Sequence, residues 1–487
     1  MLSDLNEALA RAAERRYDVC VCGTGPAGIT TARKLAEHGK RILLLEGGGL
    51  SYSKRSQDLY NATNVGLQYW FLEEAGRARY FGGTSNHWAG RCGIFDDIDF
   101  DTRDDSGLPG WPISRQQVLR TREEAQQILD IPGANLAPVQ DPHFATPLFA
   151  RSGYALSPPT RFLEKYGAEI RQSQHIEAFY NANLVGVGLS DDQTRVQHVF
   201  VRNYNGKMTK VVASQFVLAL GGIENARILL NASSQVPGGI GNHSGMVGRC
   251  FMEHLNVSIG RFLVTDLQFW RRGSFPLAPT DTMIRQHGIG NGFLVFEPNP
   301  LPQSSGRFKA LREFLRDTSC AVPPIAGVAR RIVDFDCPGD GTIGSLIEQA
   351  PNPNSRVSLT DEVDAFGLRR AQLNWQLSDR DWKTIRILSI ESAKEMARLN
   401  RARVQLAPFI LDRDRFVEVS GHAHHMGTTR MSADPRYGVV DENCRVHGVH
   451  NLYIGGSSVF PTGGGTNPTL TIVMLALRLA DFLANQK

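Results

Sequence analysis

The sequence predicts an α/β fold: a Rossmann-like domain assembled from discontinuous segments, with an inserted and mainly antiparallel β-sheet domain. Three observations support this architecture. Near the N-terminus, strand patterns at 17–22 and 41–46 enclose a helix pattern at 26–38, which predicts a parallel unit with a right-handed crossover. Apolar strand and helix patterns return late in the chain. Between them, from about 256 to 405, alternating strand patterns dominate.

Apolar periodicity predicts the remaining elements. They are helices at 2–15, 222–230, 380–398 and 470–483 and a buried strand at 215–220. A glycine-rich, aromatic loop is expected at 76–93, and long surface loops at 296–331, where proline and arginine are dense. The acidic stretch 96–105 is interpreted as a solvated loop, with a calcium site as the alternative.

Composition excludes several classes of protein. In 487 residues, 53 Lys and Arg against 49 Asp and Glu give a net charge of +4, and the basic residues are scattered. Nucleic acid or an anionic membrane is therefore not the expected partner. The seven cysteines contain no CxxC pair, which argues against zinc ribbons, iron–sulfur sites and disulfide scaffolds. Cys20 and Cys22 are expected to act as small apolar residues on a buried strand.

The N-terminal residues contain no apolar run of the length that a secretory signal needs. The longest apolar stretch, Leu470–Leu483, includes Arg478 and Asp481 and is too short to span a bilayer. These features lead us to expect a soluble, cytoplasmic protein without a membrane partner.

A GxGxxG sequence predicts a dinucleotide site. Gly23, Gly25 and Gly28 lie between the first strand and its helix, and Glu46 ends the next strand. Gly23 makes the tight turn, Gly25 admits a pyrophosphate, and Gly28 lets the helix pack on the sheet. The helix N-terminus attracts phosphate, and Glu46 can accept hydrogen bonds from ribose hydroxyls. The acid disfavours NADP, but it does not distinguish NAD from FAD.

Three later segments carry a family resemblance. They are 79–88 (RYFGGTSNHW), 424–431 (HHMGTTRM) and 451–471 (NLYIGG, continuing to PTGGGTNPTLT). With GxGxxG, and with 348–357, they resemble the glucose-methanol-choline (GMC) family of FAD-dependent alcohol oxidoreductases, particularly its pyranose 2-oxidase and C-glycoside 3-oxidase branch. The chain departs from the family pattern at Asn225-Ala226, where a Ser/Thr-Pro is usual, and at Gly456, where many members have Asp.

The resemblance implies FAD as cofactor and an architecture like those of GMC enzymes and p-hydroxybenzoate hydroxylase. The FAD-binding domain is expected to comprise 1–105, 165–255 and 405–487, and the substrate domain 106–164 and 256–404. The implied cofactor-binding residues are Gly23, Gly25, Pro26, Ala27, Gly28, Glu46, Gly47, Arg79, Gly82, Gly83, Ser85, Asn86, His87, Trp88, Ala219, Gly456, Asn467, Pro468 and Thr469. His87 either bonds FAD covalently, contacts it without a bond, or packs in the core.

The resemblance also implies the catalytic pair. The family's base is the His of HxxGT, here His424, and its partner is Asn467. A histidine base suits alcohol oxidation because its pKa lies near the working pH. Asn467 and Pro468 are expected to be the N-cap and first residue of the last helix. Alternatives for 422–425 are His425 as the base, a metal site, and packing alone; no metal is expected.

The expected activity is FAD-dependent oxidation of a secondary hydroxyl of a sugar or glycoside to a carbonyl, with hydride transfer to flavin N5. Oxygen, a quinone or another acceptor would then take the electrons. The alternatives are oxidation of a non-sugar alcohol or polyol, a nicotinamide-dependent dehydrogenase, and a flavoprotein that carries electrons without oxidising alcohols. A homo-oligomer is left open.

Overall fold

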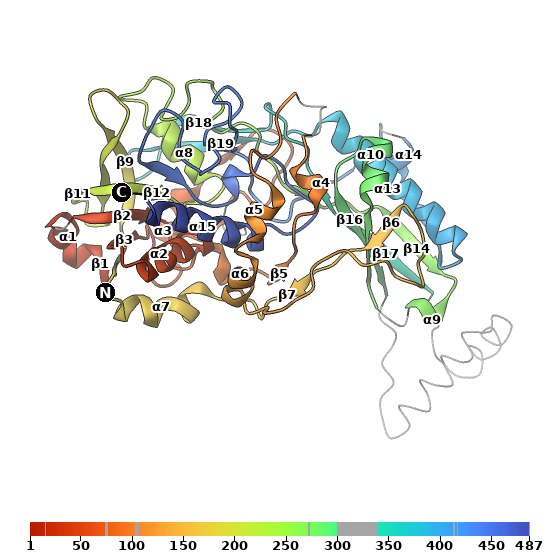
Figure 1. Cartoon of the computed structure of the whole chain (residues 1–487). Coiled ribbons are helices and arrows are strands. Elements are labelled where there is room, and N and C mark those ends of the chain that lie inside the picture. Colours follow the sequence, from red (N-terminus) through yellow and green to blue (C-terminus); the bar gives the residue numbers. More distant parts are fainter. Residues whose placement is uncertain are drawn as a thin grey trace.

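The computed structural model describes residues 1–487 except 15, 74–75, 103–106, 271–272, 300–338, 413, 416 and 487. In this part of the chain two lobes are visible, each built around one large sheet, with both chain ends in the first lobe (Figure 1). The surface loops predicted at 296–331 lie outside the described residues from 300 onward. Among the described residues, none of the helices combines the length and apolar character that a membrane crossing requires.

The first lobe is built on a six-stranded parallel sheet. Its order is β1 (Leu2–Asp4), β8 (Ile176–Tyr180), β3 (Ile42–Leu45), β2 (Tyr17–Cys22), β12 (Ala213–Leu218) and β21 (Leu452–Ile454). All five pairings are parallel. The central strands are apolar and buried on both faces, as is typical of parallel sheets. Cys20 and Cys22 are buried on β2, as predicted.

Helices cover this sheet and pack against one another (Figure 1). The last helix, α15 (Thr469–Ala484), packs on α2 (Pro26–Glu37), and both bury apolar faces. The other helices of this lobe are α1 (Leu5–Glu14), α3 (Lys54–Gln57), α5 (Arg115–Leu119), α6 (Arg122–Ile128), α7 (Phe162–Gln172) and α8 (Glu224–Asn231).

The second lobe is built on an antiparallel sheet. Its order is β20 (Ala402–Leu406), β14 (Gly260–Val264), β17 (Asp340–Glu348), β16 (Gly292–Pro298), β15 (Phe275–Pro279) and β6 (Phe149–Arg151), and the short β13 (His254–Leu255) also pairs with β17. The 20-residue α13 (Asp379–Arg398) packs against β20 and β17. The smaller helices here are α4 (Asp97–Phe100), α9 (Leu267–Trp270), α10 (Asp281–His287) and α14 (Pro408–Leu411).

Three small sheets and three 3₁₀ turns complete the described elements. The strands are β9 (Asn183–Leu189), β10 (Val196–Arg202) and β11 (Met208–Val211); β18 (Arg356–Val363), β19 (Arg369–Asn374) and β4 (Thr63–Asn64); and β5 (Arg91–Cys92) with β7 (Ala155–Leu156). The turns are η1 (Asp58–Tyr60), η2 (Gly83–Asn86) and η4 (Ser457–Val459). The domain boundaries expected from the resemblance stay a prediction.

Two local predictions were wrong. Residues 2–4 form β1 rather than the start of a helix, because their backbone pairs with β8 at the edge of the sheet. The acidic stretch is not simply a solvated loop: Asp99 is fully buried, and it forms a capping box with Asp96 at the start of α4. Asp99 also accepts hydrogen bonds from Asn291 Nδ2 and Gly465 N. Residues 103–105 of that stretch lie outside the described residues.

The turn between β2 and α2 is a close backbone crossing. Gly23 has φ +106°, in the left-handed region that favours glycine. A Cβ on Gly28 would lie 1.9 Å from the carbonyl oxygen of Gly23, whereas a Cβ on Gly25 would meet nothing within 4 Å. Gly28 therefore has a packing role inside the protein, and Gly25 faces open space.

We expect Gly28→Ala to destabilise the cofactor-free protein by about 3 kcal/mol, because the added methyl group overpacks a rigid backbone contact. Gly25→Ala, the matched control, should cost only about 0.5 kcal/mol as a poorer helix cap, while weakening dinucleotide binding. Denaturant unfolding of the two cofactor-free variants measures the difference. Equal destabilisation by the two substitutions would contradict the assignment of separate roles.

Candidate active site

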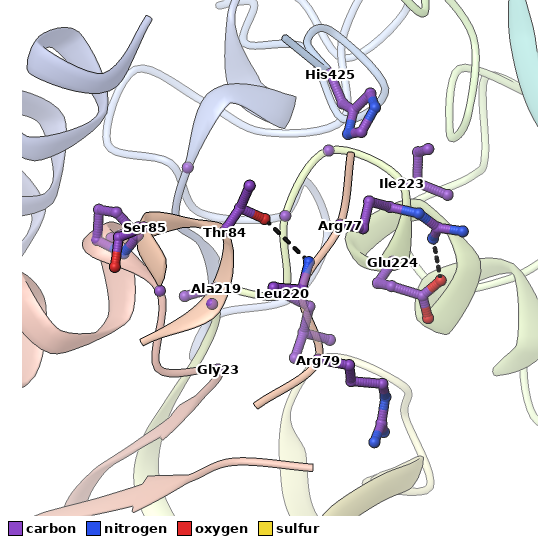
Figure 2. A pocket seen from close by; sticks show the side chains of 18 of the residues that line it. Gly23, Arg77, Arg79, Thr84, Ser85, Ala219, Leu220, Ile223, Glu224 and His425 are labelled. Atoms are coloured by element: carbon purple, nitrogen blue, oxygen red, sulfur yellow. Dashed lines mark hydrogen bonds and ion pairs between the residues drawn. The ribbon is translucent and has the colours of Figure 1, made fainter. Parts of the chain in front are cut away.

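A cavity of about 560 Å³ lies at the ends of several parallel strands. Its walls come from the β2–α2 turn, the loop before β5, the segment after β12, residues 422–425 and the start of α15. In Figure 2 His425 lies at the top of the view and Gly23 at the lower left, with Ala219 and Leu220 between them. Segments far apart in sequence therefore enclose one site, which is usual where parallel strands end.

At the Gly23 end, the site offers backbone donors and one acid. The N-terminus of α2 has no side-chain cap, so its first N–H groups remain free to bind a phosphate. Glu46 is 7% exposed and accepts hydrogen bonds from the Thr24 hydroxyl (2.6 Å) and Gly48 N (2.9 Å). Its carboxylate is thus held in place at the cavity wall.

The glycine-rich loop lies directly on this turn. Gly82 N donates to Thr24 Oγ1 at 3.1 Å, and the Cα of Gly25 lies 3.0 Å from where a Cβ on Gly83 would be. The same threonine hydroxyl donates to Glu46, so Thr24 couples the loop to the acid. His87 and Trp88 follow this loop into the cavity wall. Packing alone does not describe His87.

Most of the cofactor-binding residues expected from the resemblance line the cavity. These are Gly23, Gly25, Pro26, Ala27, Glu46, Gly47, Arg79, Gly83, Ser85, His87, Trp88, Ala219, Gly456, Asn467, Pro468 and Thr469. Gly28, Gly82 and Asn86 do not. Gly28 supports the turn from behind, and Asn86 Nδ2 instead donates to the Phe81 carbonyl. Sixteen of the nineteen expected residues therefore line the cavity, and the other three are not part of its wall.

A buried ion-pair cluster in the wall was not anticipated from the sequence. Glu224 pairs with Arg77 at 2.9 Å and with Arg227 at 3.1 Å, and Arg227 also pairs with Asp364 at 2.6 Å. Figure 2 shows Arg77 and Glu224 turned toward each other. Only Arg227 and Glu224 are close in the sequence, as an i,i+3 pair. The other two ion pairs join distant segments, so no spacing signal could have revealed the cluster.

The histidine segment is positioned by an irregular antiparallel pairing. Met252 pairs with Met426 and Asn256 with Ser420, so residues 253–255 oppose the longer stretch 421–425. The excess is accommodated by a bulge in which Ala423 has φ +61°. Such left-handed conformations outside glycine are costly and cluster at functional sites.

This pairing brings three polar side chains into one line. His424 Nδ1 lies 2.8 Å from His254 Nδ1, and His424 Nε2 lies 3.1 Å from Asn467 Nδ2. His254 Nε2 lies 2.9 Å from the Gly464 carbonyl oxygen. The predicted pair of His424 and Asn467 is therefore in contact at the cavity wall, and His254 lies behind it.

Burial keeps this histidine cluster neutral. Desolvation, together with the neighbouring His254, lowers the pKa of His424 well below its usual value. Desolvation likewise lowers the pKa of His254 to about 4 and that of His425 to about 3. A neutral imidazole can accept a proton, so the electrostatics of the site suit a base.

Glu253 holds the backbone of both paired segments. Its carboxylate accepts from the backbone N–H of His254 (2.7 Å) and of His424 (2.9 Å), and from the hydroxyl of Tyr69. Burial raises the pKa of Glu253 to about 7, and these donors oppose that rise. Because every backbone partner donates, the ionised form fits the geometry best.

The other two histidines have different surroundings. The rings of His422 and His424 stack 5.8 Å apart. His425 instead packs against Tyr69 and Phe251. A metal site had been considered for 422–425, but the group whose ligand atoms lie within 4.8 Å is Glu253, His254 and His424. Both facing Nδ1 atoms already hydrogen-bond each other.

The start of the last helix differs slightly from expectation. α15 begins at Thr469 with Pro468 at the cap position, one residue later than predicted. Asn467 makes no cap; its amide reaches His424, and its Oδ1 is a buried acceptor without a partner among the described residues. Gly464 and Gly465 do not approach the cavity, because Phe95 and Asn291 occupy the space beside them.

Sequence reasoning did not identify Glu253 or His254. They lie about 170 positions before His424, in a stretch without a glycine or spacing signature. The only available sign was a pair of ionisable residues in an apolar strand pattern, FMEHL at 251–255. Buried ionisable groups in such patterns are functional candidates.

Comparisons with known proteins bear on the family and the fold of this chain. A model described as GMC oxidoreductase matches residues 351–476, and one for an NAD(P)-binding Rossmann-like domain matches 21–81. The chain is 24% identical to the fructose dehydrogenase large subunit of Gluconobacter japonicus, over 96% of this chain and 98% of that protein. It is 33% identical to C-glycoside 3-oxidase of Microbacterium trichothecenolyticum over 32% and 30% of the two chains.

A solved structure of similar fold is that of pyridoxine 4-oxidase from Mesorbium loti. It covers 97% of this chain and 100% of that one, with a TM-score of 0.63 and 17% sequence identity. This likeness confirms the predicted Rossmann-like domain with its antiparallel companion. Together with the full-length relative and the GMC oxidoreductase model over residues 351–476, these findings identify the chain as an FAD-dependent oxidoreductase that carries a GMC oxidoreductase domain.

Proposed function

We propose that this enzyme oxidises a secondary hydroxyl of a sugar or glycoside to a carbonyl, with His424 as the base and Asn467 as its partner. The single observation that supports this most directly is the 3.1 Å contact between His424 Nε2 and Asn467 Nδ2 in the cavity wall. A base and a hydrogen-bond donor side by side can hold one hydroxyl group between them.

The residues present fit FAD. The cavity is continuous from the uncapped N-terminus of α2, which suits a pyrophosphate, to the histidine cluster. Glu46 lines the same cavity and is proposed to accept hydrogen bonds from the ribose, and Gly25 leaves open space for the pyrophosphate. The unpartnered Oδ1 of Asn467 and the free donors of the turn are polar groups that a bound cofactor and substrate can satisfy.

The protein residues would act on the hydroxyl proton. His424 Nε2 accepts this proton as the carbon–hydrogen bond breaks, and Asn467 Nδ2 donates to the substrate oxygen and stabilises its developing negative charge. Bound FAD supplies the acceptor for the hydride that leaves carbon. Burial of His424 favours the neutral imidazole as the starting form.

A sugar is favoured over other alcohols because relatives named fructose dehydrogenase and C-glycoside 3-oxidase match this chain. Further support comes from the polar groups that line the cavity, which include Arg91 and His422, whose ring lies 5.8 Å from that of His424. The place of His87 in the cavity wall suits both a covalent bond to FAD and a contact without a bond.

His424→Ala should retain FAD but lose alcohol-driven flavin reduction by about 10²- to 10⁴-fold, the usual contribution of a general base. Stopped-flow absorbance under anaerobic conditions measures this rate. His447→Ala is a suitable control, because His447 lies outside the cavity wall. His425→Ala tests the other candidate base. Loss of reduction in His425→Ala but not in His424→Ala would transfer the role.

The pH dependence of flavin reduction follows from the lowered pKa of His424. The base is active when neutral, so activity should persist below pH 6.5 and fall only as the pH drops through the lowered pKa. Anaerobic reduction rates across this range give the acid limb. A limb centred near 7 would indicate Glu253 instead, and it would disappear in Glu253→Gln.

Substrate class can be tested by an anaerobic flavin-reduction screen of free sugars, glycosides, polyols and simple alcohols. We expect reduction by a sugar or glycoside with a second-order rate constant at least about tenfold above that for any simple alcohol, because a sugar's further hydroxyls add binding energy in the transition state. Faster reduction by a non-sugar alcohol or polyol would overturn the sugar assignment while leaving the base assignment intact.

A further inference from the structure

At one end of the chain of hydrogen bonds through His254, the donor and the acceptor can be assigned. The Gly464 carbonyl oxygen can only accept, and it lies 2.9 Å from His254 Nε2. His254 Nε2 must therefore carry the proton. In a neutral imidazole only one nitrogen is protonated, so His254 Nδ1 is an acceptor.

The proton on the next ring follows from this. His254 Nδ1 faces His424 Nδ1 at 2.8 Å, and two bare nitrogens at this distance would repel each other. His424 Nδ1 must therefore donate, which leaves His424 Nε2 without a proton. That bare nitrogen faces Asn467 Nδ2, which is a donor.

We propose that His254 is a positioning residue that holds His424 in the tautomer protonated at Nδ1, so that Nε2 presents its lone pair to the substrate hydroxyl. In the opposite tautomer, Nε2 would already carry a proton and could not accept another. This inference rests on the proposed role of His424 as base, and it adds the reason why only one of the two tautomers is populated.

The surroundings stabilise this arrangement. His254 is fully buried, and desolvation keeps it neutral, with a pKa of about 4. Glu348 Oε1 accepts from Gly464 N at 3.1 Å, which holds in place the residue whose carbonyl oxygen is the acceptor. Glu253 ties the backbone of His254 to that of His424, which sets the spacing of the two rings.

The same contact serves after proton transfer. When His424 Nε2 accepts the hydroxyl proton, the ring carries a positive charge, and its Nδ1–H still donates to His254 Nδ1. A charge-assisted hydrogen bond of this kind is stronger than a neutral one, so the contact stabilises the protonated base. No proton needs to leave His254.

The first test compares two substitutions in the FAD-loaded enzyme. His254→Leu removes the acceptor, and His254→Asn keeps an oxygen near the position of Nδ1. We expect flavin reduction to fall about 10- to 100-fold in His254→Leu, in line with other groups that orient a functional histidine. In His254→Asn it should stay within about fivefold of the unaltered protein. FAD content and thermal unfolding check that both variants fold.

The second test observes the tautomer itself. ¹⁵N NMR of histidine-labelled protein distinguishes a protonated ring nitrogen from a bare one, and loss of signals in His424→Gln assigns that ring. We expect His424 to be protonated at Nδ1 in the unaltered protein and in His254→Asn, and to populate both tautomers in His254→Leu. This readout does not depend on turnover and would not respond to a merely structural role.

Two outcomes would overturn the inference. One is a spectrum of the unaltered protein in which His424 carries its proton at Nε2. The other is flavin reduction at the unaltered rate in a folded His254→Leu. If His254→Leu does not fold, the spectrum of the unaltered protein still decides. Failure of the proposed function looks different: His424→Ala would keep reducing the flavin whatever tautomer the spectrum reports.

Discussion

The active site depends on the antiparallel contact between residues 252–256 and 420–426. Residues 254–255 form β13, which pairs with β17 in the antiparallel sheet. The opposite segment continues into 427–431, whose N–H groups donate to carbonyls of 457–459 after the parallel strand β21. His424, the proposed base, is therefore held between the two sheets, and its position depends on how they are joined. Glu253 lies at the centre of this contact and sets the distance between the two backbones, because it accepts hydrogen bonds from both.

The cluster around His424 combines two requirements that usually conflict. A histidine base for an alcohol proton needs to be neutral and held in a fixed orientation, yet buried polar groups are costly without partners. Here burial lowers the pKa values of the histidines, and the facing ring, the carbonyl of Gly464 and the amide of Asn467 supply the partners. The left-handed backbone at Ala423 is unfavourable in itself, and the surrounding contacts stabilise it.

The parts of the fold that were predictable depend on local signals. The β2–α2–β3 unit, the strand β12 and the helices α13 and α15 follow from apolar periodicity and glycine turns, and the structure has each of them within a few residues of expectation. The approximate position of the cofactor cavity follows from GxGxxG and the resemblance. Even Gly28, which does not line the cavity, was expected to let the helix pack closely on the sheet.

What could not be predicted depends on contacts between distant segments. His254 meets His424 only because a bulge absorbs the difference between 253–255 and 421–425, and no pattern in either segment reveals the other. The burial of Asp99 depends on Asn291 and Gly465, and the strand at 2–4 exists only because β8 offers an edge.

Because of the pairing of β13 with β17, some parts of the second lobe tolerate substitution less than others. His254 lies opposite Glu348 in that pairing, and Glu348 in turn holds the peptide of Gly464, so three segments would have to be altered together. The outer strands β6 and β20 lie at the two edges of this sheet and contribute no residue to the cavity wall. Substitutions in those strands can therefore change the second lobe without moving His424 and its partners.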